Sequence, residues 1–334
     1  MTYNKKSVED IDVSGKKVLV RCDFNVPMKD GKITDETRIN GALPTIKYLL
    51  SKNAAVILCS HMGRPKGEFN PAFSLAPVAK RLSELLGQEV VLAADVIGED
   101  AKAKAAALKP GEVMMIENVR FHKEEEKNDP AFAKELASMA EIYVNDAFGT
   151  AHRAHASMVA AAKLRPAAMG RLMEEEVKAL SNGLNNPQRP LMAVVGGSKV
   201  STKLDLLNNL VKKVDKLVIS GGMAHTFMKA SGINTVNEAN SLVQMDMIDT
   251  AKEIMKVAKE NNCEIILPQD VVVSKEFKAE AEHKTVDLEH IPAEGWILMD
   301  VGEKTIAAIN KKLDECKTLV WNGPLGVFEL KPFD

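Results

Sequence analysis

Short apolar runs alternate along the chain with segments whose apolar residues recur at helical spacing. The runs in KKVLVRCDF and AAVILCS predict strands, and a helix is predicted over 38–51 from one apolar face: Ile39, Leu43, Ile46 and Leu50. Further strands are predicted over 89–92, 113–116, 141–145, 191–195, 216–220, 264–267 and 318–321. Because strands and helices alternate, we expect an α/β protein whose parallel sheets are covered by helices on both faces.

One break in this pattern divides the chain. Pro166 and Gly170 interrupt it, a helix with one apolar face is predicted over 171–184, and Gly183 is expected to stop that helix. The expected parts are an N-terminal lobe, an interdomain helix with its linker, and a C-terminal lobe, over residues 1–168, 169–189 and 190–334. A chain of 334 residues is long enough for two such lobes.

Charge and composition exclude several classes of partner. A net charge of −2 and 4% aromatic residues favour neither nucleic acid nor an anionic membrane surface. The four cysteines lie far apart without a CxxC pair, which indicates reduced thiols. The N-terminus lacks an apolar signal segment, and no stretch reaches the roughly 18 apolar residues of a membrane span. We therefore expect a cytoplasmic protein.

The arginines are distributed unevenly. All nine lie at or before position 189, and four flank predicted strands: Arg38, Arg64, Arg120 and Arg153. Parallel sheets bind ligands at the carboxyl ends of their strands, and a guanidinium group grips phosphate or carboxylate with two hydrogen bonds. These four are predicted to trap a small polyanion. The other candidates for this role are interpreted as solvated surface residues: Arg81, Arg165, Arg171 and Arg189.

Polar residues accompany the arginines at the same strand ends. VRCDFNVP supplies Arg21, Asp23 and Asn25, and SHMGRP supplies His61 beside a glycine that lets a ligand approach the backbone. Asp23 can orient guanidinium groups and accept a substrate hydroxyl, or it can simply cap a turn before Pro27. Because SHMGRP is expected at the same edge of the sheet, the interpretation of Asp23 as a substrate-binding residue is favoured.

Two histidines three residues apart, His152 and His155, raise the alternative of a metal site. No Cys, Asp or third His accompanies them, and Arg153 between them would repel a cation but suits a phosphate. His122 and the acidic run 124–126 are interpreted as a solvated face.

Glycine-rich turns follow three predicted strands in the second half: VVGGSKVSTK, VISGGMAHTF and LVWNGPLGVF. In the first turn Ser201 is the predicted helix N-cap, and Lys199 and Lys203 lie within reach of an anion at the helix N-terminus. The third turn adds Asn322 and Glu329. Neither GxxxxGK[ST] nor GxGxxG occurs, yet three such turns in one domain indicate a nucleotide crevice.

Seven ordered motifs resemble those of the phosphoglycerate kinase family: VRCDFNVP, SHMGRPKG, ENVRF, DAFGTAHRAHAS, GGSKVSTKLDLL, ISGGMAHTF and WNGPLGVFE. The resemblance implies two Rossmann-like, three-layer αβα lobes joined by a hinge helix, in a monomer. The N-terminal lobe would hold 3-phosphoglycerate or 1,3-bisphosphoglycerate, and the C-terminal lobe ATP or ADP with Mg²⁺. The sequence ends before the family's GGGD[ST] motif, so the C-terminal lobe is expected to be incomplete and the magnesium ligand is not identified.

The resemblance also assigns residue roles. Substrate would be bound by Asp23, Asn25, Arg38, His61, Arg64, Arg120 and Arg153. Nucleotide would be bound by Gly197, Lys199, Lys203, Gly221, Gly222, Asn322 and Glu329, with the glutamate on the ribose. Arg38 and Lys199 would be the catalytic clamps on the transferring phosphoryl group.

The implied reaction is reversible transfer of the acyl phosphate of 1,3-bisphosphoglycerate to ADP in glycolysis, with closure about the hinge. It needs no protein nucleophile, and no GxSxG or HExxH motif occurs. Two alternatives stay open. A dinucleotide-dependent oxidoreductase is disfavoured by the absence of GxGxxG. A non-catalytic two-lobed anion-binding protein needs one ligand crevice, whereas two different phosphate-binding devices are present.

Overall fold

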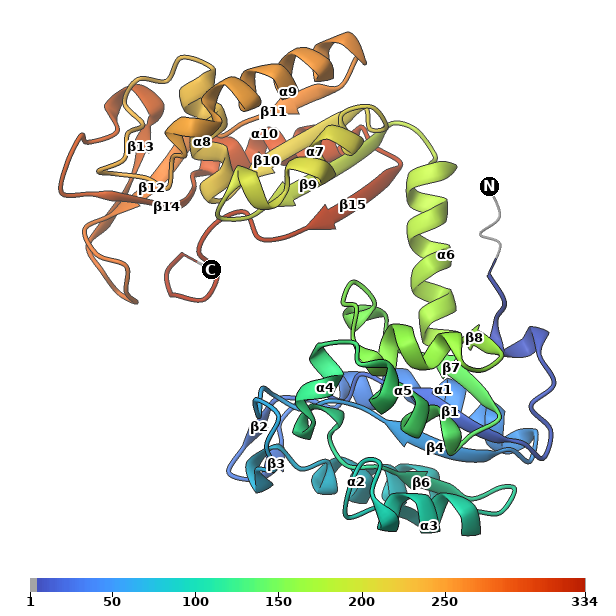
Figure 1. Cartoon of the computed structure of the whole chain (residues 1–334). Helices are drawn as coiled ribbons and strands as arrows, with labels where there is room; N and C mark the ends of the chain where they lie inside the picture. The colour runs from blue at the N-terminus through green and yellow to red at the C-terminus, as the bar shows by residue number, and fades with distance from the viewer. Residues whose placement is uncertain (1–4, 334) are drawn as a thin grey trace. The chain divides into compact units, whose positions relative to one another are not determined.

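The computed structural model describes residues 5–333 (Figure 1). The chain divides into two compact units, one reaching Ala179 and one beginning at Leu180, so the division falls inside helix α6 (Arg171–Asn185). We call them unit 1 and unit 2. The expected lobe boundaries at 168 and 190 stay a prediction. Gly183 was expected to stop the helix, and this is wrong, because α6 runs through it to Asn185.

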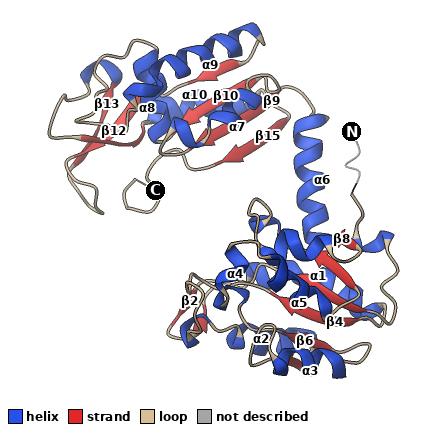
Figure 2. Ribbon diagram, viewed as in Figure 1, coloured by secondary structure: helices blue, strands red, loops and turns tan. Residues whose placement is uncertain are grey.

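A parallel six-stranded sheet forms the middle of unit 1, in the order β5-β6-β4-β1-β7-β8 (Figure 2). Its strands are β1 (Lys17–Arg21), β4 (Ala55–Cys59), β5 (Val90–Leu92), β6 (Val113–Met115), β7 (Ile142–Asn145) and β8 (Ala167–Met169). A short antiparallel hairpin, β2 (Met28–Lys29) and β3 (Lys32–Ile33), follows β1.

Helices cover both faces of this sheet. The α-helices are α1 (Thr37–Ser51), α2 (Ala76–Leu86), α3 (Glu99–Ala107), α4 (Lys123–Glu126) and α5 (Pro130–Ser138). Shorter turns are η1 (Val8–Asp10), η2 (Pro71–Phe73), η3 (Val119–Phe121), η4 (Phe148–Thr150), η5 (Ala156–Ala160, a π-helix) and η6 (Ala161–Lys163). Val18 and Val20 of β1 join the core on the side of α1, whereas Leu19 joins the core on the side of α5. Alternate side chains of one strand therefore serve two cores, as the sequence pattern predicts.

Unit 2 repeats this construction with a smaller parallel sheet, in the order β11-β10-β9-β15. Its strands are β9 (Leu191–Gly196), β10 (Lys216–Ser220), β11 (Glu264–Ile266) and β15 (Thr318–Asn322). Its helices are α7 (Leu204–Leu210), α8 (Gly222–Ala230), α9 (Ile248–Glu260) and α10 (Glu303–Asp314), with short turns η7 (Val200–Thr202), η8 (Met245–Met247) and η9 (Leu288–His290). Leu191 and Ala193 face one core, and Met192 and Val194 face the other.

A second sheet of unit 2 is antiparallel and was not predicted. It pairs β12 (Asp270–Ser274) with β13 (His283–Asp287) on one side and β14 (Ile297–Val301) on the other. The expected parallel sheets are present in both units, and this antiparallel sheet is an addition to them. The β13 side chains are mostly exposed, so the strand lacks the apolar run by which the others were recognised. All the strands that were predicted do form, within three residues of the expected bounds.

Candidate active site

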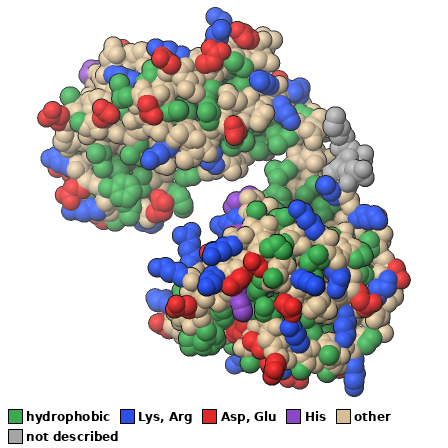
Figure 3. Space-filling view, viewed as in Figure 1, with side chains coloured by type: hydrophobic (Ala, Val, Ile, Leu, Met, Phe, Trp, Pro, Cys, Tyr) green, Lys and Arg blue, Asp and Glu red, His purple; other side chains and the backbone are tan. Residues whose placement is uncertain are grey.

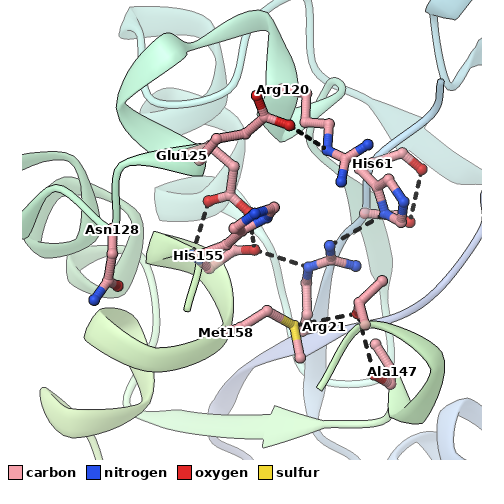
Figure 4. Close-up of polar contacts among 12 residues, drawn as sticks. Arg21, His61, Arg120, Glu125, Asn128, Ala147, His155 and Met158 are labelled. Carbon is pink, nitrogen blue, oxygen red and sulfur yellow. Dashed lines mark hydrogen bonds and ion pairs between the residues drawn. The ribbon is translucent and has the colours of Figure 1, made fainter. Parts of the chain in front are cut away.

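Arginine and histidine side chains gather where four neighbouring strands of unit 1 end. Arg21 ends β1, His61 follows β4, Arg120 lies in η3 after β6, and Arg153 follows η4 after β7. Four arginines lie near His61, and we call them the arginine cluster: Arg21, Arg120, Arg153 and Arg38. Burial and the charges of this cluster lower the pKa of His61 to about 2. His61 is therefore a neutral ring among guanidinium groups (Figure 4).

Arg38, at the start of α1, is held by the turn after β1. Its Nη1 donates to Asp23 Oδ1 at 3.0 Å and to the Asn25 carbonyl at 3.1 Å. Asp23 Oδ1 also accepts the backbone N–H of Asn25 at 3.2 Å, so the carboxylate closes a turn and orients a guanidinium together. Because the Arg38 side chain is 48% exposed, a fixed charge faces solvent.

Gly63 links Asn25 to Arg120. Its N–H donates to Asn25 Oδ1 at 2.8 Å, and its carbonyl accepts from Arg120 Nη1 at 2.8 Å. The glycine has φ +58°, and a Cβ there would lie 2.4 Å from the Phe73 ring. Only glycine fits this position.

The remaining arginines are less constrained. Arg153 is half-buried and lies near enough to His61 to lower its pKa. Arg64 is exposed, and its guanidinium makes no hydrogen bond or ion pair with any residue from 5 to 333. Figure 3 shows lysine and arginine side chains gathered on unit 1 near α4 and the β2–β3 hairpin.

A buried polar chain lies behind the cluster, and sequence reasoning missed it. Glu125 of α4 is fully buried, although the acidic run 124–126 was interpreted as a solvated face; for this residue the interpretation is wrong. Its carboxylate accepts from the N–H and Oγ of Ser157. Arg21 is 1% exposed, and its guanidinium donates to Ser157 and His61.

Unit 2 brings its glycine turns into backbone contact. A Cβ on Gly196 would lie 1.8 Å from the Pro324 carbonyl oxygen, and one on Gly323 would lie 2.3 Å from the Gly196 oxygen. Gly221 has φ +64°, and a Cβ there would lie 2.8 Å from the Gly197 oxygen. The turns after β9, β10 and β15 are therefore packed too closely to carry side chains.

A cavity of ≈ 420 Å³ opens beside these turns, within the usual size range of small-molecule sites. Four of the residues predicted to bind nucleotide line it: Gly197, Gly221, Gly222 and Glu329. Leu242, Met299 and Val327 give it apolar walls, and none of the described residues that line it is a lysine or arginine. The cavity suits an uncharged group rather than a phosphate.

The predicted cationic residues lie outside this cavity. Lys203 Nζ donates to Asn322 Oδ1 at 2.5 Å, which joins two predicted residues. Lys199 is exposed and lines an adjoining groove, which shares four lining residues with the cavity: Ser198, Glu238, Ser241 and Leu242. Ser201 was predicted to cap a helix, and this is wrong: it lies inside η7, and α7 begins only at Leu204.

Two other polar residues that line the cavity, Asp300 and His225, were not predicted from the sequence. Burial raises the pKa of Asp300, in β14, to about 6, and its Oδ1 accepts the N–H of Val301 at 2.7 Å. His225 accepts the N–H of Leu242 through Nδ1 at 3.1 Å, and burial lowers its pKa to about 4. A carboxylate directly after the apolar run ILM was the only available hint of Asp300.

One unit thus carries a cluster of arginines at strand ends, and the other a cavity with apolar walls beside glycine turns and a lysine. These are the parts of a nucleotide-dependent phosphotransferase.

Comparison with known proteins gives the family. The phosphoglycerate kinase family model matches residues 8–334. Phosphoglycerate kinase from Clostridium perfringens is 54% identical over all of this chain and 84% of its own length, and that from Clostridioides difficile is 54% identical over 99% and 82%. The solved structure of phosphoglycerate kinase from Coxiella burnetii has a TM-score of 0.83 at 43% identity, covering 98% of this chain and 82% of its own. The chain belongs to the phosphoglycerate kinase family.

The activity follows from this membership. The enzyme transfers a phosphoryl group between 1,3-bisphosphoglycerate and ADP, giving 3-phosphoglycerate and ATP, as its family does in glycolysis.

Proposed function

We propose that unit 1 binds 3-phosphoglycerate or 1,3-bisphosphoglycerate and that unit 2 binds ADP or ATP. The observation that carries this division is the arginine cluster around the neutral His61. Fixed positive charge of this density suits a small ligand that bears both phosphate and carboxylate.

In unit 1, Arg38, Arg64, Arg120 and Arg153 are the proposed anion ligands. Asp23 and Asn25 are proposed to contact the glycerate hydroxyl and carboxylate. The contact from Arg38 to Asp23 supports this, because it holds the guanidinium beside both residues while leaving part of it exposed. His61 is proposed to add an uncharged hydrogen-bond donor.

In unit 2, the base and ribose are proposed to occupy the cavity, with Glu329 on the ribose and Gly221 and Gly222 on the base. Lys199, Lys203 and Asn322 are proposed to bind the phosphates. The absence of lysine and arginine from the cavity lining among residues 5–333 supports this separation of base from phosphates.

We propose Mg²⁺ as the ion that accompanies the nucleotide phosphates. Residues 5–333 contain no group of three or more His, Cys, Asp or Glu side chains that could hold a metal. The residues present therefore do not form a metal cage of their own, and no protein ligand is assigned to the ion. The roles proposed for the arginines and lysines do not depend on it.

Catalysis in this proposal consists of positioning and charge stabilisation. The attacking and leaving oxygens both belong to substrates, so no protein nucleophile takes part. Arg38 and Lys199 are proposed to stabilise the negative charge that spreads over the transferring group. Closure about a hinge, a monomeric state and a cytoplasmic location stay predictions. No helix within residues 5–333 is long and apolar enough to cross a membrane.

Calorimetric titrations combined with a coupled assay of ATP formation test the division. The chain should bind 3-phosphoglycerate and ADP independently, and Lys203→Ala should weaken ADP binding while leaving 3-phosphoglycerate binding unchanged. Lys252→Ala, which removes an exposed lysine of α9, is the matched control. Loss of 3-phosphoglycerate binding in Lys203→Ala would overturn the assignment.

A further inference from the structure

The polar chain behind the arginine cluster has a defined direction. Both oxygens of the buried Glu125 carboxylate accept from Ser157, at 2.8 Å from its N–H and 2.5 Å from its hydroxyl. A carboxylate offers only acceptor oxygens, so the Ser157 hydroxyl must donate its single proton to Glu125. Its oxygen is then free to accept.

Arg21 supplies the donor to that oxygen. Its Nε donates to Ser157 Oγ at 2.8 Å, and its Nη1 donates to the Cys22 carbonyl. Because the guanidinium is 1% exposed, its charge needs a buried counter-charge, and Glu125 provides one through the serine hydroxyl. The orientation of Arg21 is thereby fixed.

The last link of the chain is His61. Arg21 Nη2 lies 3.2 Å from His61 Nδ1, and a guanidinium group can only donate. Nδ1 must therefore accept, which leaves the ring proton on Nε2. The surrounding arginines keep the ring neutral, since burial and their charges lower its pKa to about 2.

We propose that Arg21, Ser157 and Glu125 are positioning residues that hold His61 as its neutral Nε2–H tautomer. His61 then donates a hydrogen bond to the anionic substrate without adding a further positive charge to the arginines around it. This inference rests on the proposed binding of 3-phosphoglycerate by unit 1.

Nitrogen NMR of protein with ring-labelled histidine tests the tautomer directly in the wild-type protein. The signals of His61, identified by their loss in His61→Asn, should be those of a neutral Nε2–H ring across about pH 6–8. A ring protonated on Nδ1, or a charged ring, would overturn the proposal whether or not any variant folds.

Ser157→Ala removes the central hydroxyl and should mix the two tautomers of His61. It should also weaken 3-phosphoglycerate binding about tenfold, the usual order for loss of a well-oriented hydrogen bond to a charged group. Tyr143→Phe is the matched control, because it also removes one buried hydroxyl. That hydroxyl donates to the Ser157 carbonyl at 2.6 Å and is not part of the hydrogen-bond series from Glu125 to His61. Ser157→Thr keeps the hydroxyl and should keep the tautomer.

The outcomes separate this inference from the proposed function. If Ser157→Ala folds and changes the His61 tautomer no more than Tyr143→Phe does, the positioning role is wrong. An Nε2–H ring in a wild-type protein that does not bind 3-phosphoglycerate would support the hydrogen-bond chain and refute the proposed function.

Discussion

The two candidate sites are built by opposite means. In unit 1, the arginine cluster is oriented by side chains, such as Asp23 for Arg38 and Glu125 through Ser157 for Arg21. In unit 2, the cavity is shaped by backbones in contact at Gly196 and Gly323 and by apolar walls. The first site is defined by charge and the second by volume.

This difference implies different sensitivities to mutation. Removing the guanidinium of Arg38 or Arg153 should leave the fold intact, because both side chains keep solvent access, but it removes attraction for an anion. Adding one methyl group to a glycine turn of unit 2 changes no charge but forces two backbones apart. The predictions below test this contrast, from the largest expected effect to the smallest.

Arg38→Ala should lower kcat by about 100-fold or more, with a smaller effect on 3-phosphoglycerate affinity. A charge that contacts the transferring group acts mainly in the transition state. The coupled assay measures kcat, and Arg81→Ala is the control, because Arg81 pairs on the surface with Glu36 and Glu84. An unchanged kcat in Arg38→Ala would show that the charge of unit 1 does not act on the moving group.

Gly196→Ala should destabilise unit 2 by about 1–3 kcal/mol and greatly weaken ADP binding, since the new Cβ would lie 1.8 Å from a carbonyl oxygen. Binding of 3-phosphoglycerate by unit 1 should persist. Thermal unfolding with and without ADP measures both effects. Gly183→Ala is the control. Gly183 lies inside helix α6, and its Cβ would lie 3.7 Å from the nearest atom, in the Val320 side chain. Normal ADP affinity in Gly196→Ala would contradict a site defined by volume.

The sequence predicted the layered fold because each buried strand carries its own signal. Alternate residues of β1 and β9 serve two cores, which requires apolar runs that are visible in isolation. Strand β13 faces solvent along most of its length and gave no such signal. Strands β12 and β14 were also missed, although they are largely buried and carry apolar residues. Prediction therefore succeeded for the strands of the two parallel sheets and failed for the antiparallel sheet of unit 2.

The candidate sites divide in the same way. Arg38, Arg120 and Gly197 were named as candidates because strand-end position and residue type together suggest chemistry. Glu125 was not found, since a run of three acidic residues does not reveal which one a four-residue helix turns inward toward Ser157. Asp300 was missed because β14 belongs to the unpredicted sheet. Whether such residues belong to a site depends on contacts between segments that are distant in the sequence.

Arg153→Ala should weaken 3-phosphoglycerate binding about tenfold and make it less sensitive to salt, because one charge in contact with the ligand is lost. The effect should appear in Kd rather than in kcat. Titration with ADP serves as the internal control and should be unchanged. Loss of ADP binding with the fold preserved would mean that the two sites are not separated by unit as proposed.

Asp300→Asn should produce the smallest effect, and its size depends on pH. Burial raises the pKa of Asp300 from 3.8 to about 6, so the folded state holds this proton more tightly than the unfolded state does. Stability is therefore lost as pH rises through that window and stays lower above it. Asparagine keeps an acceptor for the Val301 N–H but carries no charge to bury.

The variant should accordingly have a higher Tm than the wild type at about pH 7.5, and the difference should shrink toward about pH 4.5. Asp249→Asn, on an aspartate whose side chain is 97% exposed, should show no such trend. Asp300 lines the cavity, so ADP should reduce the Tm difference if the carboxylate gains a hydrogen-bond donor from the bound nucleotide. A Tm difference that is constant across pH would show that Asp300 carries its charge at no cost, and the walls of the unit 2 cavity would then be more polar than the structure implies.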